Sequence, residues 1–171
     1  MPHNNERPIR KAIGVVRRSD VKQKENASLL TQKEEILAKA KLEGYTIVDI
    51  FEDDGLSAYH LSVSERPAMI KALKLALSQT EEIEALFFYE ESRLSRQFSD
   101  FVISFYNPVK KEKPHFAFFS TKKVAEWNPN DITSVFEFAT AAKDSSIKSA
   151  RIIDAQGESL KVSIKSSRLL K

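Results

Sequence analysis

Two arginines three residues apart, Arg93 and Arg96, follow shortly after the apolar run from Ile83 to Tyr89. Such a run is typical of a buried strand, so the arginines are expected where the strand gives way to a loop or helix. Planar guanidinium groups bind phosphate through two parallel hydrogen bonds, which a surface lysine does less well. The simpler interpretation, in which an arginine only pairs with a local carboxylate, stays open for each one taken alone.

A second arginine pair lies near the N-terminus, where the strand-like run from Ala12 to Val16 is followed by Arg17, Arg18 and Ser19. Here a hydroxyl group accompanies the cations. The ends of strands in an α/β sheet are where such folds place their sites. Because the pattern recurs at two strand ends, the sequence favours phosphate binding over local pairing.

Composition limits the chemistry further. The chain has 171 residues, 42% of them hydrophobic, which predicts a single core, and a net charge of +3, which permits nucleic-acid binding without requiring it. It has no cysteine and three histidines, which argues against a disulfide, a thiol nucleophile or a zinc site. We therefore expect no metal and no cofactor. Short apolar runs and a polar start predict a cytoplasmic protein that makes no membrane contact.

Apolar periodicity predicts alternating strands and helices. Strands are expected at residues 11–17, 45–51, 83–89 and 115–120, and helices at 26–42, 67–77, from 98 to the basic stretch before Pro114, and from 131 onward. The first helix should bury a stripe of Leu29, Leu30, Ile36 and Leu37, and end near Gly44. Alternation of this kind predicts an α/β fold with a central, mainly parallel sheet of about four to five strands flanked by helices.

Four short motifs occur in a fixed order along this predicted framework. They are Arg17 with Ser19, Ser28 with Gln32, the loop 53–58 with Asp54 and Ser57 followed by Arg66 and Pro67, and the segment Ser92-Arg93-Leu94-Ser95-Arg96. In this order they resemble the catalytic domain of serine recombinases of the resolvase/invertase type, and a weaker match adds Arg151. The chain departs from the family pattern by lacking an aromatic residue before Arg17, and by having Ala58 in place of glycine and Ser92 in place of aspartate.

The resemblance implies a mechanism and a role for each matched residue. Ser19 would be the nucleophile that attacks a DNA phosphodiester and forms a 5′-phosphoserine intermediate, before strand exchange and religation. Arg17, Arg66, Arg93 and Arg96 would bind the scissile phosphate and stabilise its transition state, with Arg93 helping to protonate the leaving 3′ oxygen. The supporting residues would be Ser28, Gln32, Asp54, Ser57 and Arg151. Phosphoryl transfer does not intrinsically need a metal if arginines supply the positive charge.

Several assignments stay open from the residues alone. Ser28, Ser57 and Ser95 are rival hydroxyl groups for the role of Ser19, and of these Ser28 is the best suited to position phosphate. Either Asp53 or Asp54 could orient an arginine, or simply form a turn, because a bare carboxylate repels a phosphodiester. Glu90 and Glu91 are interpreted as adjacent strand residues that point to opposite faces, and are assigned no catalytic role.

The resemblance also implies an organisation and partners. Residues 1–10 would form a flexible arm, 11–130 the catalytic α/β domain, 131–155 a long interface helix, and 156–171 a basic tail or the start of a missing DNA-binding region. The partners would be double-stranded DNA and further copies of the chain, as a homodimer that assembles into a tetramer on DNA.

Two other functional classes are alternatives to a recombinase. Ala58 and Ser92 favour a noncatalytic DNA-binding or oligomerisation module that retains the recombinase fold. A nucleotide-binding α/β domain is disfavoured, because only four glycines are present and none forms a glycine-rich phosphate loop.

Overall fold

The computed structural model describes residues 8–18, 28–53, 61–94 and 98–131. Most of the expected arm, the expected interface helix and the basic tail lie outside these ranges. Within the described ranges, no helix has the length and apolarity that crossing a bilayer requires.

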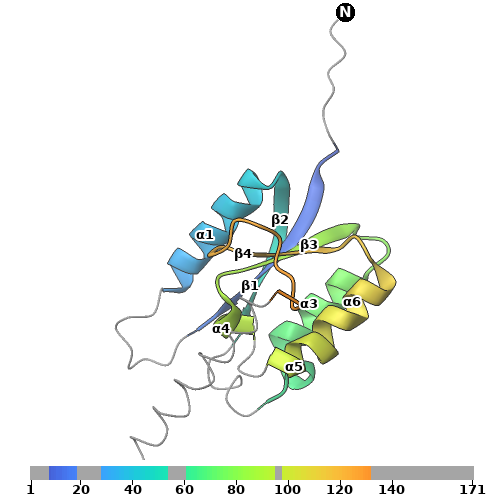
Figure 1. Ribbon diagram of the computed structural model, residues 1–171. Helices are drawn as coiled ribbons and strands as arrows, with labels where there is room; N and C mark the ends of the chain where they lie inside the picture. The colour runs from blue at the N-terminus through green and yellow to red at the C-terminus, as the bar shows by residue number, and fades with distance from the viewer. Residues whose placement is uncertain (1–7, 19–27, 54–60, 95–97, 132–171) are drawn as a thin grey trace, which may run out of the picture. The chain divides into compact units, whose positions relative to one another are not determined.

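A parallel sheet of four strands forms the centre of the described part of the chain. The strands are β1 (Arg10–Arg17), β2 (Tyr45–Asp53), β3 (Ile83–Phe88) and β4 (Ala117–Ser120), in the spatial order β2-β1-β3-β4. Every pair is parallel, and helices lie on both faces of the sheet (Figure 1). The predicted α/β fold, with a mainly parallel sheet flanked by helices, is confirmed.

The two inner strands are buried on both faces, as strands covered by helices on each side must be. Along β3, Leu86 and Phe88 point into one hydrophobic cluster, whereas Ala85 and Phe87 point into the other. This alternation follows from the two-residue repeat of a strand. It explains why the sequence of β3 is an almost continuous apolar run.

One face of the sheet is covered by α1 (Leu29–Leu42), which begins after its N-cap residue Ser28 and not at residue 26 as predicted. The predicted apolar stripe is also wrong in part. Leu30 and Leu37 are 66% and 49% exposed, whereas Ile36 is fully buried. The buried face of the helix also includes Gln32 and Ala40, because residues four apart share one face and Gln32 finds polar partners in the sheet.

The other face is covered by α3 (Pro67–Leu77), which has the predicted bounds, and by the segment 98–112. That segment was predicted as one helix but contains a π-helical turn, Val102–Tyr106, between α5 (Phe98–Phe101) and α6 (Asn107–Glu112). Pro108 has no N–H group to continue the α-helical hydrogen bonds, which accounts for the irregular turn before it. A cluster of aromatic rings packs beneath this segment: Phe101, Phe105, Phe118 and Trp127.

Two glycines have a clear conformational or steric role. Gly44 has φ of 78°, a left-handed conformation that ends α1 as predicted. A Cβ atom at Gly14 would lie 3.1 Å from Cγ1 of Ile50 and 3.2 Å from Cγ2 of Ile36. A side chain at Gly14 would therefore push against both β2 and α1.

Candidate functional site

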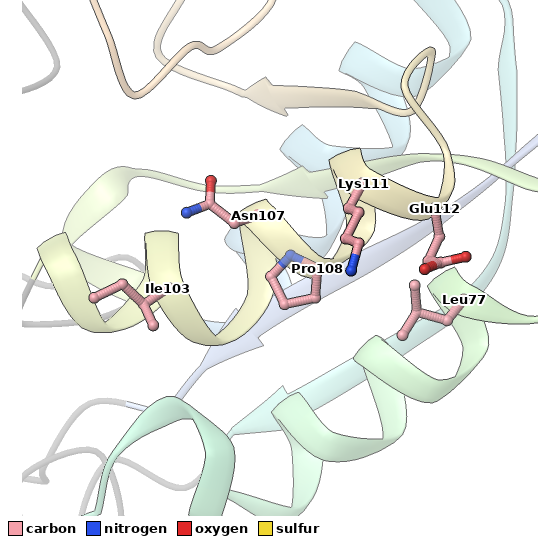
Figure 2. A pocket seen from close by; sticks show the side chains of 6 residues that line it. All are labelled: Leu77, Ile103, Asn107, Pro108, Lys111 and Glu112. Atoms are coloured by element: carbon pink, nitrogen blue, oxygen red, sulfur yellow. The ribbon is translucent and has the colours of Figure 1, made fainter.

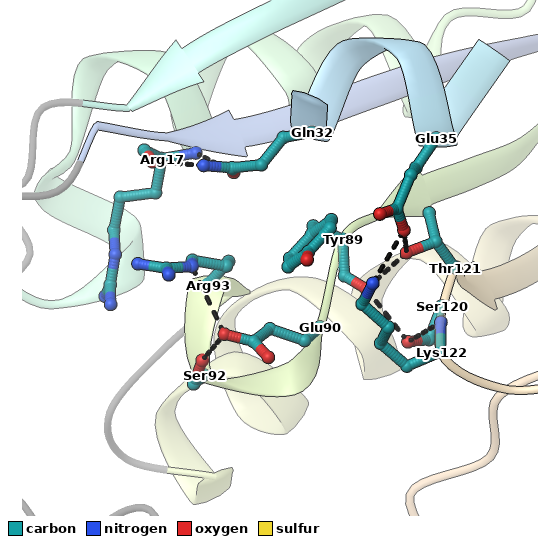
Figure 3. Close-up of polar contacts among 10 residues, drawn as sticks. All are labelled: Arg17, Gln32, Glu35, Tyr89, Glu90, Ser92, Arg93, Ser120, Thr121 and Lys122. Carbon is teal, nitrogen blue, oxygen red and sulfur yellow. Dashed lines mark hydrogen bonds and ion pairs between the residues drawn. The ribbon is translucent and has the colours of Figure 1, made fainter. Parts of the chain in front are cut away.

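The carboxyl ends of all four strands meet at one edge of the sheet, because the strands are parallel. β1 ends at Arg17 and β2 at Asp53, which are direct neighbours in the register of the sheet. The chain leaves β3 through Tyr89 into the short helix α4 (Glu91–Leu94), which carries Arg93. The two strand ends that the sequence singled out for phosphate binding therefore lie at the same edge (Figure 3).

Arg17 is held in place through its backbone by Gln32 from α1. The N–H group of Arg17 donates to Oε1 of Gln32 at 3.1 Å, and Nε2 of Gln32 donates to the carbonyl of Arg17 at 3.0 Å. Gln32 is fully buried, so it faces the site and not the solvent. The reciprocal pair satisfies two polar groups of the main chain at the end of β1, which fixes the place from which the Arg17 side chain projects.

Asp53 and Arg66 form a second polar contact at this edge. Their ion pair is 3.1 Å long, and each side chain is only 1% exposed. The Arg66 guanidinium also donates to the carbonyl of Leu94 at the end of α4. Burial lowers the pKa of Arg66 from its ordinary value, while the carboxylates of Asp53 and Asp100 oppose that shift.

The role of Arg66 in binding the scissile phosphate stays a prediction. Its guanidinium lies inside the protein against Asp53, because a buried cation needs a carboxylate and hydrogen bonds to offset its lost hydration. The sequence left open whether Asp53 or Asp54 orients an arginine. In the structure Asp53 pairs with Arg66. Asp54 lies outside the described residues.

Arg93 lies against Glu90. Nε of Arg93 is 3.3 Å from Oε1 of Glu90, and the same oxygen accepts a hydrogen bond from Oγ of Ser92 at 2.7 Å. Figure 3 shows the guanidinium groups of Arg93 and Arg17 extending to the same side of the sheet edge. Arg17 and Arg93 are both buried, so two cations lie largely withdrawn from solvent at this edge.

The interpretation of Glu90 and Glu91 as two strand residues is wrong, because β3 ends at Phe88 and Glu91 begins α4. The two carboxylates still have separate partners. Oε1 of Glu91 is 3.2 Å from Nζ of Lys123, whereas Glu90 contacts Arg93. The side chains of Glu90 and Glu91 point to different partners because the chain turns into a helix at Glu91, and not because strand residues alternate.

A polar cluster at the end of β4 was not anticipated from the sequence. The hydroxyl groups of Ser120 and Thr121 donate to the carbonyl of Tyr89 at 3.3 and 2.9 Å. Nζ of Lys122 lies 2.7 Å from Oε2 of Glu35 and 4.0 Å from the centre of the Tyr89 ring. The sequence does contain a feature that could have predicted this cluster, namely the run from Ser120 to Lys123. Hydroxyl groups and cations at a strand end are the same pattern that drew attention to Arg17.

Comparison with known proteins identifies the family of this chain. Residues 12–161 match the family model described as Resolvase, N terminal domain. The chain belongs to the resolvase family. No match was found among curated protein sequences.

Two solved structures share the fold of this resolvase domain. The N-terminal catalytic domain of TP901-1 integrase superposes with a TM-score of 0.55 at 19% identity, over 82% of this chain and 98% of that one. A resolvase family site-specific recombinase from Streptococcus pneumoniae gives a TM-score of 0.53 at 19% identity, over 90% of this chain and 98% of that one. The architecture is therefore that of a serine recombinase catalytic domain.

Ser28, a rival nucleophile in this resolvase domain, has a structural contact of its own. Its Oγ accepts a hydrogen bond from the N–H group of Thr31 at 3.1 Å and so caps the first turn of α1. The other matched site residues lie outside the described ranges: Ser19, Asp54, Ser57, Ser95, Arg96 and Arg151. Within the described ranges no three acidic or histidine side chains gather where they could hold a metal ion.

A surface hollow of about 450 Å³ lies elsewhere, between the end of α3 and the π-helical turn with α6 (Figure 2). Its lining residues are Leu77, Ile103, Asn107, Pro108, Lys111 and Glu112. None of them is a matched site residue, so the functional site is identified by its charged side chains and not by this hollow.

Proposed function

We propose that this domain is the catalytic part of a site-specific DNA recombinase that cleaves DNA with Ser19. Oγ of Ser19 attacks a phosphorus atom of the DNA backbone, loses its hydroxyl proton and forms a new P–O bond. The bond to the 3′ oxygen breaks, and that oxygen leaves with a proton as a hydroxyl group. The phosphoserine preserves the energy of the broken bond, so strand exchange and religation need no external energy source.

The pairing of Arg17 with Arg93 at one sheet edge is the observation that carries the proposal. Arg17 and Arg93 are only 8% and 5% exposed. Gln32 bonds to the backbone of Arg17, and Glu90 contacts the guanidinium of Arg93. Ser19 follows Arg17 by two residues. A phosphate that reached this edge would meet two buried guanidinium groups, one of them two residues before Ser19 in the sequence.

Fixed cations suit this reaction because negative charge develops on the phosphoryl oxygens in the transition state. Donors that are already oriented need no rearrangement when the charge appears, and they act more strongly where water is excluded. The burial of Arg17 and Arg93 provides both conditions. The positive charge of the arginines supports a reaction in which a metal ion is not required.

Double-stranded DNA is the proposed substrate and partner. A homodimer that assembles into a tetramer on DNA, through the helix expected at 131–155, stays part of the proposal. The supporting role of Asp54, Ser57 and Arg151 in the site is also part of the proposal.

A covalent trap tests the proposal. The natural protein is incubated with a pool of nicked random-sequence duplexes in excess EDTA, and adducts that survive denaturant are counted on a gel. A nick next to the cleaved bond lets a short strand diffuse away, so religation fails and the adduct accumulates. Adducts that form with the protein joined to the 5′ end support the proposal. No adduct, or one that needs added magnesium, would contradict it.

A further inference from the structure

We infer that Glu90 is a positioning residue, which fixes the guanidinium of Arg93 for contact with the DNA phosphate, and that Ser92 holds the Glu90 carboxylate in place. The inference rests on the proposed function for its catalytic consequence. The contact itself is a statement about the fold and can be tested separately.

The geometry joins three residues through one oxygen atom. Oε1 of Glu90 accepts from Oγ of Ser92 at 2.7 Å and lies 3.3 Å from Nε of Arg93. The backbone adds a further link, because the N–H group of Arg93 donates to the carbonyl of Glu90 at 2.9 Å. Side chain and main chain of Glu90 therefore both restrain Arg93.

Burial explains why Arg93 needs a carboxylate. The side chain of Arg93 is 6% exposed, whereas that of Glu90 is 36% exposed. A guanidinium that has lost most of its water is costly unless an anion and hydrogen bonds replace it. Glu90 supplies an anion at the Nε side of the group and so contributes to the orientation of the planar fork.

The neighbouring carboxylates are engaged with other cations. Glu91 lies 3.2 Å from Lys123, and Asp53 lies 3.1 Å from Arg66. Neither ion pair involves Arg93. The direct contact of 3.3 Å between Glu90 and Arg93 is the one on which the inference rests.

Glu90 is itself positioned from the neighbouring strand. The carbonyl of Tyr89 accepts hydrogen bonds from the hydroxyl groups of Ser120 and Thr121 at 3.3 and 2.9 Å. These contacts fix the backbone immediately before Glu90 to the end of β4 (Figure 3). The polar cluster that the sequence did not predict therefore supports the residue that orients Arg93.

The test compares Glu90→Gln and Glu90→Ala with Glu43→Ala in the natural protein. Glu43 is a matched control, because it forms a partly buried ion pair with Lys39 of 2.7 Å near the far end of α1. The rate of covalent adduct formation on the nicked duplex pool is measured, together with DNA retention on a gel and the midpoint of urea unfolding.

We expect Glu90→Ala to slow adduct formation by the folded protein roughly 10- to 100-fold, since contacts to charged groups have energies of that order. DNA retention should change little, whereas the unfolding midpoint should fall, because the buried guanidinium of Arg93 loses its anion. Glu90→Gln should lie between Glu90→Ala and the unmodified protein, because it keeps an acceptor but loses the charge. Glu43→Ala should react at the unmodified rate. A rate for Glu90→Ala equal to that of Glu43→Ala would overturn the inference.

A relocated carboxylate gives a second arm. Ser92 contacts Oε1 of Glu90 directly, so the double variant Glu90→Ala, Ser92→Asp places an anion close to the same position. It should recover most of the lost rate, which loss of a merely structural contact would not predict. Failure of this rescue, with the double variant folded, would count against positioning by charge.

The Nε–Hε resonance of Arg93 in an NMR spectrum tests the contact with Glu90 independently of the proposed recombinase function. If the unmodified protein forms no adduct, the proposed function fails, but the contact is still tested. A shift of this resonance in Glu90→Gln and not in Glu43→Ala supports the contact. An unshifted resonance in Glu90→Gln would overturn it.

Discussion

Asp53 and Arg66 form an ion pair of 3.1 Å whose side chains are each only 1% exposed. The pair joins the end of β2 to the residue before α3, and Arg66 also bonds to the Leu94 carbonyl at the end of α4. Three segments around the carboxyl edge are thus fixed by one guanidinium. This arrangement makes Arg66 a structural support of the site, with Asp53 as its counter-ion.

Loss of Asp53 should therefore destabilise the domain strongly. Asp53→Ala leaves a buried guanidinium without its carboxylate, and breaking a buried pair in this way costs about 3–5 kcal/mol. Urea denaturation measures the free energy of unfolding. The control Glu126→Ala breaks the more exposed pair with Lys110 and should cost less than about 1 kcal/mol. Equal losses for the two variants would contradict the structural role of the buried pair.

Gln32 should matter through the backbone of Arg17. Gln32→Leu keeps a side chain of similar size but leaves the N–H and carbonyl groups of Arg17 without these bonds, at about 1–3 kcal/mol for each buried group. The Arg17 amide should also exchange its hydrogen faster. Glu34→Leu, at an exposed position of the same helix, is the control and should change neither quantity. Unchanged exchange at Arg17 in Gln32→Leu would refute this explanation.

Gly14 should not tolerate a branched side chain. The atoms of Ile50 and Ile36 lie 3.1 and 3.2 Å from the position that a Cβ would occupy. Gly14→Val should lower the free energy of unfolding by about 1–3 kcal/mol through overpacking. Addition of Ile50→Ala should restore part of that loss in urea denaturation. A double variant less stable than the sum of both single changes would rule out a steric cause.

The strands were predictable from sequence because the burial of each depends on a short local run. The apolar run from Ile83 to Tyr89 identifies β3, which ends one residue earlier at Phe88. The bounds of α3 follow from Pro67 and the periodicity after it. The buried face of α1 was harder to predict, because Gln32 replaces an apolar residue there. Its burial depends on polar groups of β1, which only the folded sheet brings close.

The strand ends that carry the candidate site could be predicted from the sequence, but the contacts between its side chains could not. Arg17 and Arg93 could be assigned to strand ends, and parallel strands bring those ends to one edge. The contact of Glu90 with Arg93 depends on the helical turn that begins at Glu91, which strand periodicity does not reveal. The burial of Arg66 depends on Asp53, which lies on a different element.

Arg17 should be far more sensitive to substitution than its neighbour Arg18. Arg17→Lys keeps the charge but loses the planar fork, so we expect adduct formation to slow about tenfold or more. The Arg18 side chain is 69% exposed and only 3.7 Å from Glu52, so Arg18→Lys should react at nearly the unmodified rate. Adduct yield over time on the nicked duplexes measures both. The same rate for both variants would contradict a catalytic role for the planar guanidinium of Arg17.

The identity of the residue joined to DNA tests the central claim most directly. Adducts trapped on nicked duplexes are digested with protease and nuclease, and the modified peptide is sequenced by mass spectrometry. We predict a single phosphoserine at Ser19 and no adduct from Ser19→Ala, whereas any adduct formed by Ser57→Ala should still be joined through Ser19. Modification at Ser28, Ser57 or Ser95, or adduct formation by Ser19→Ala, would contradict the proposed mechanism.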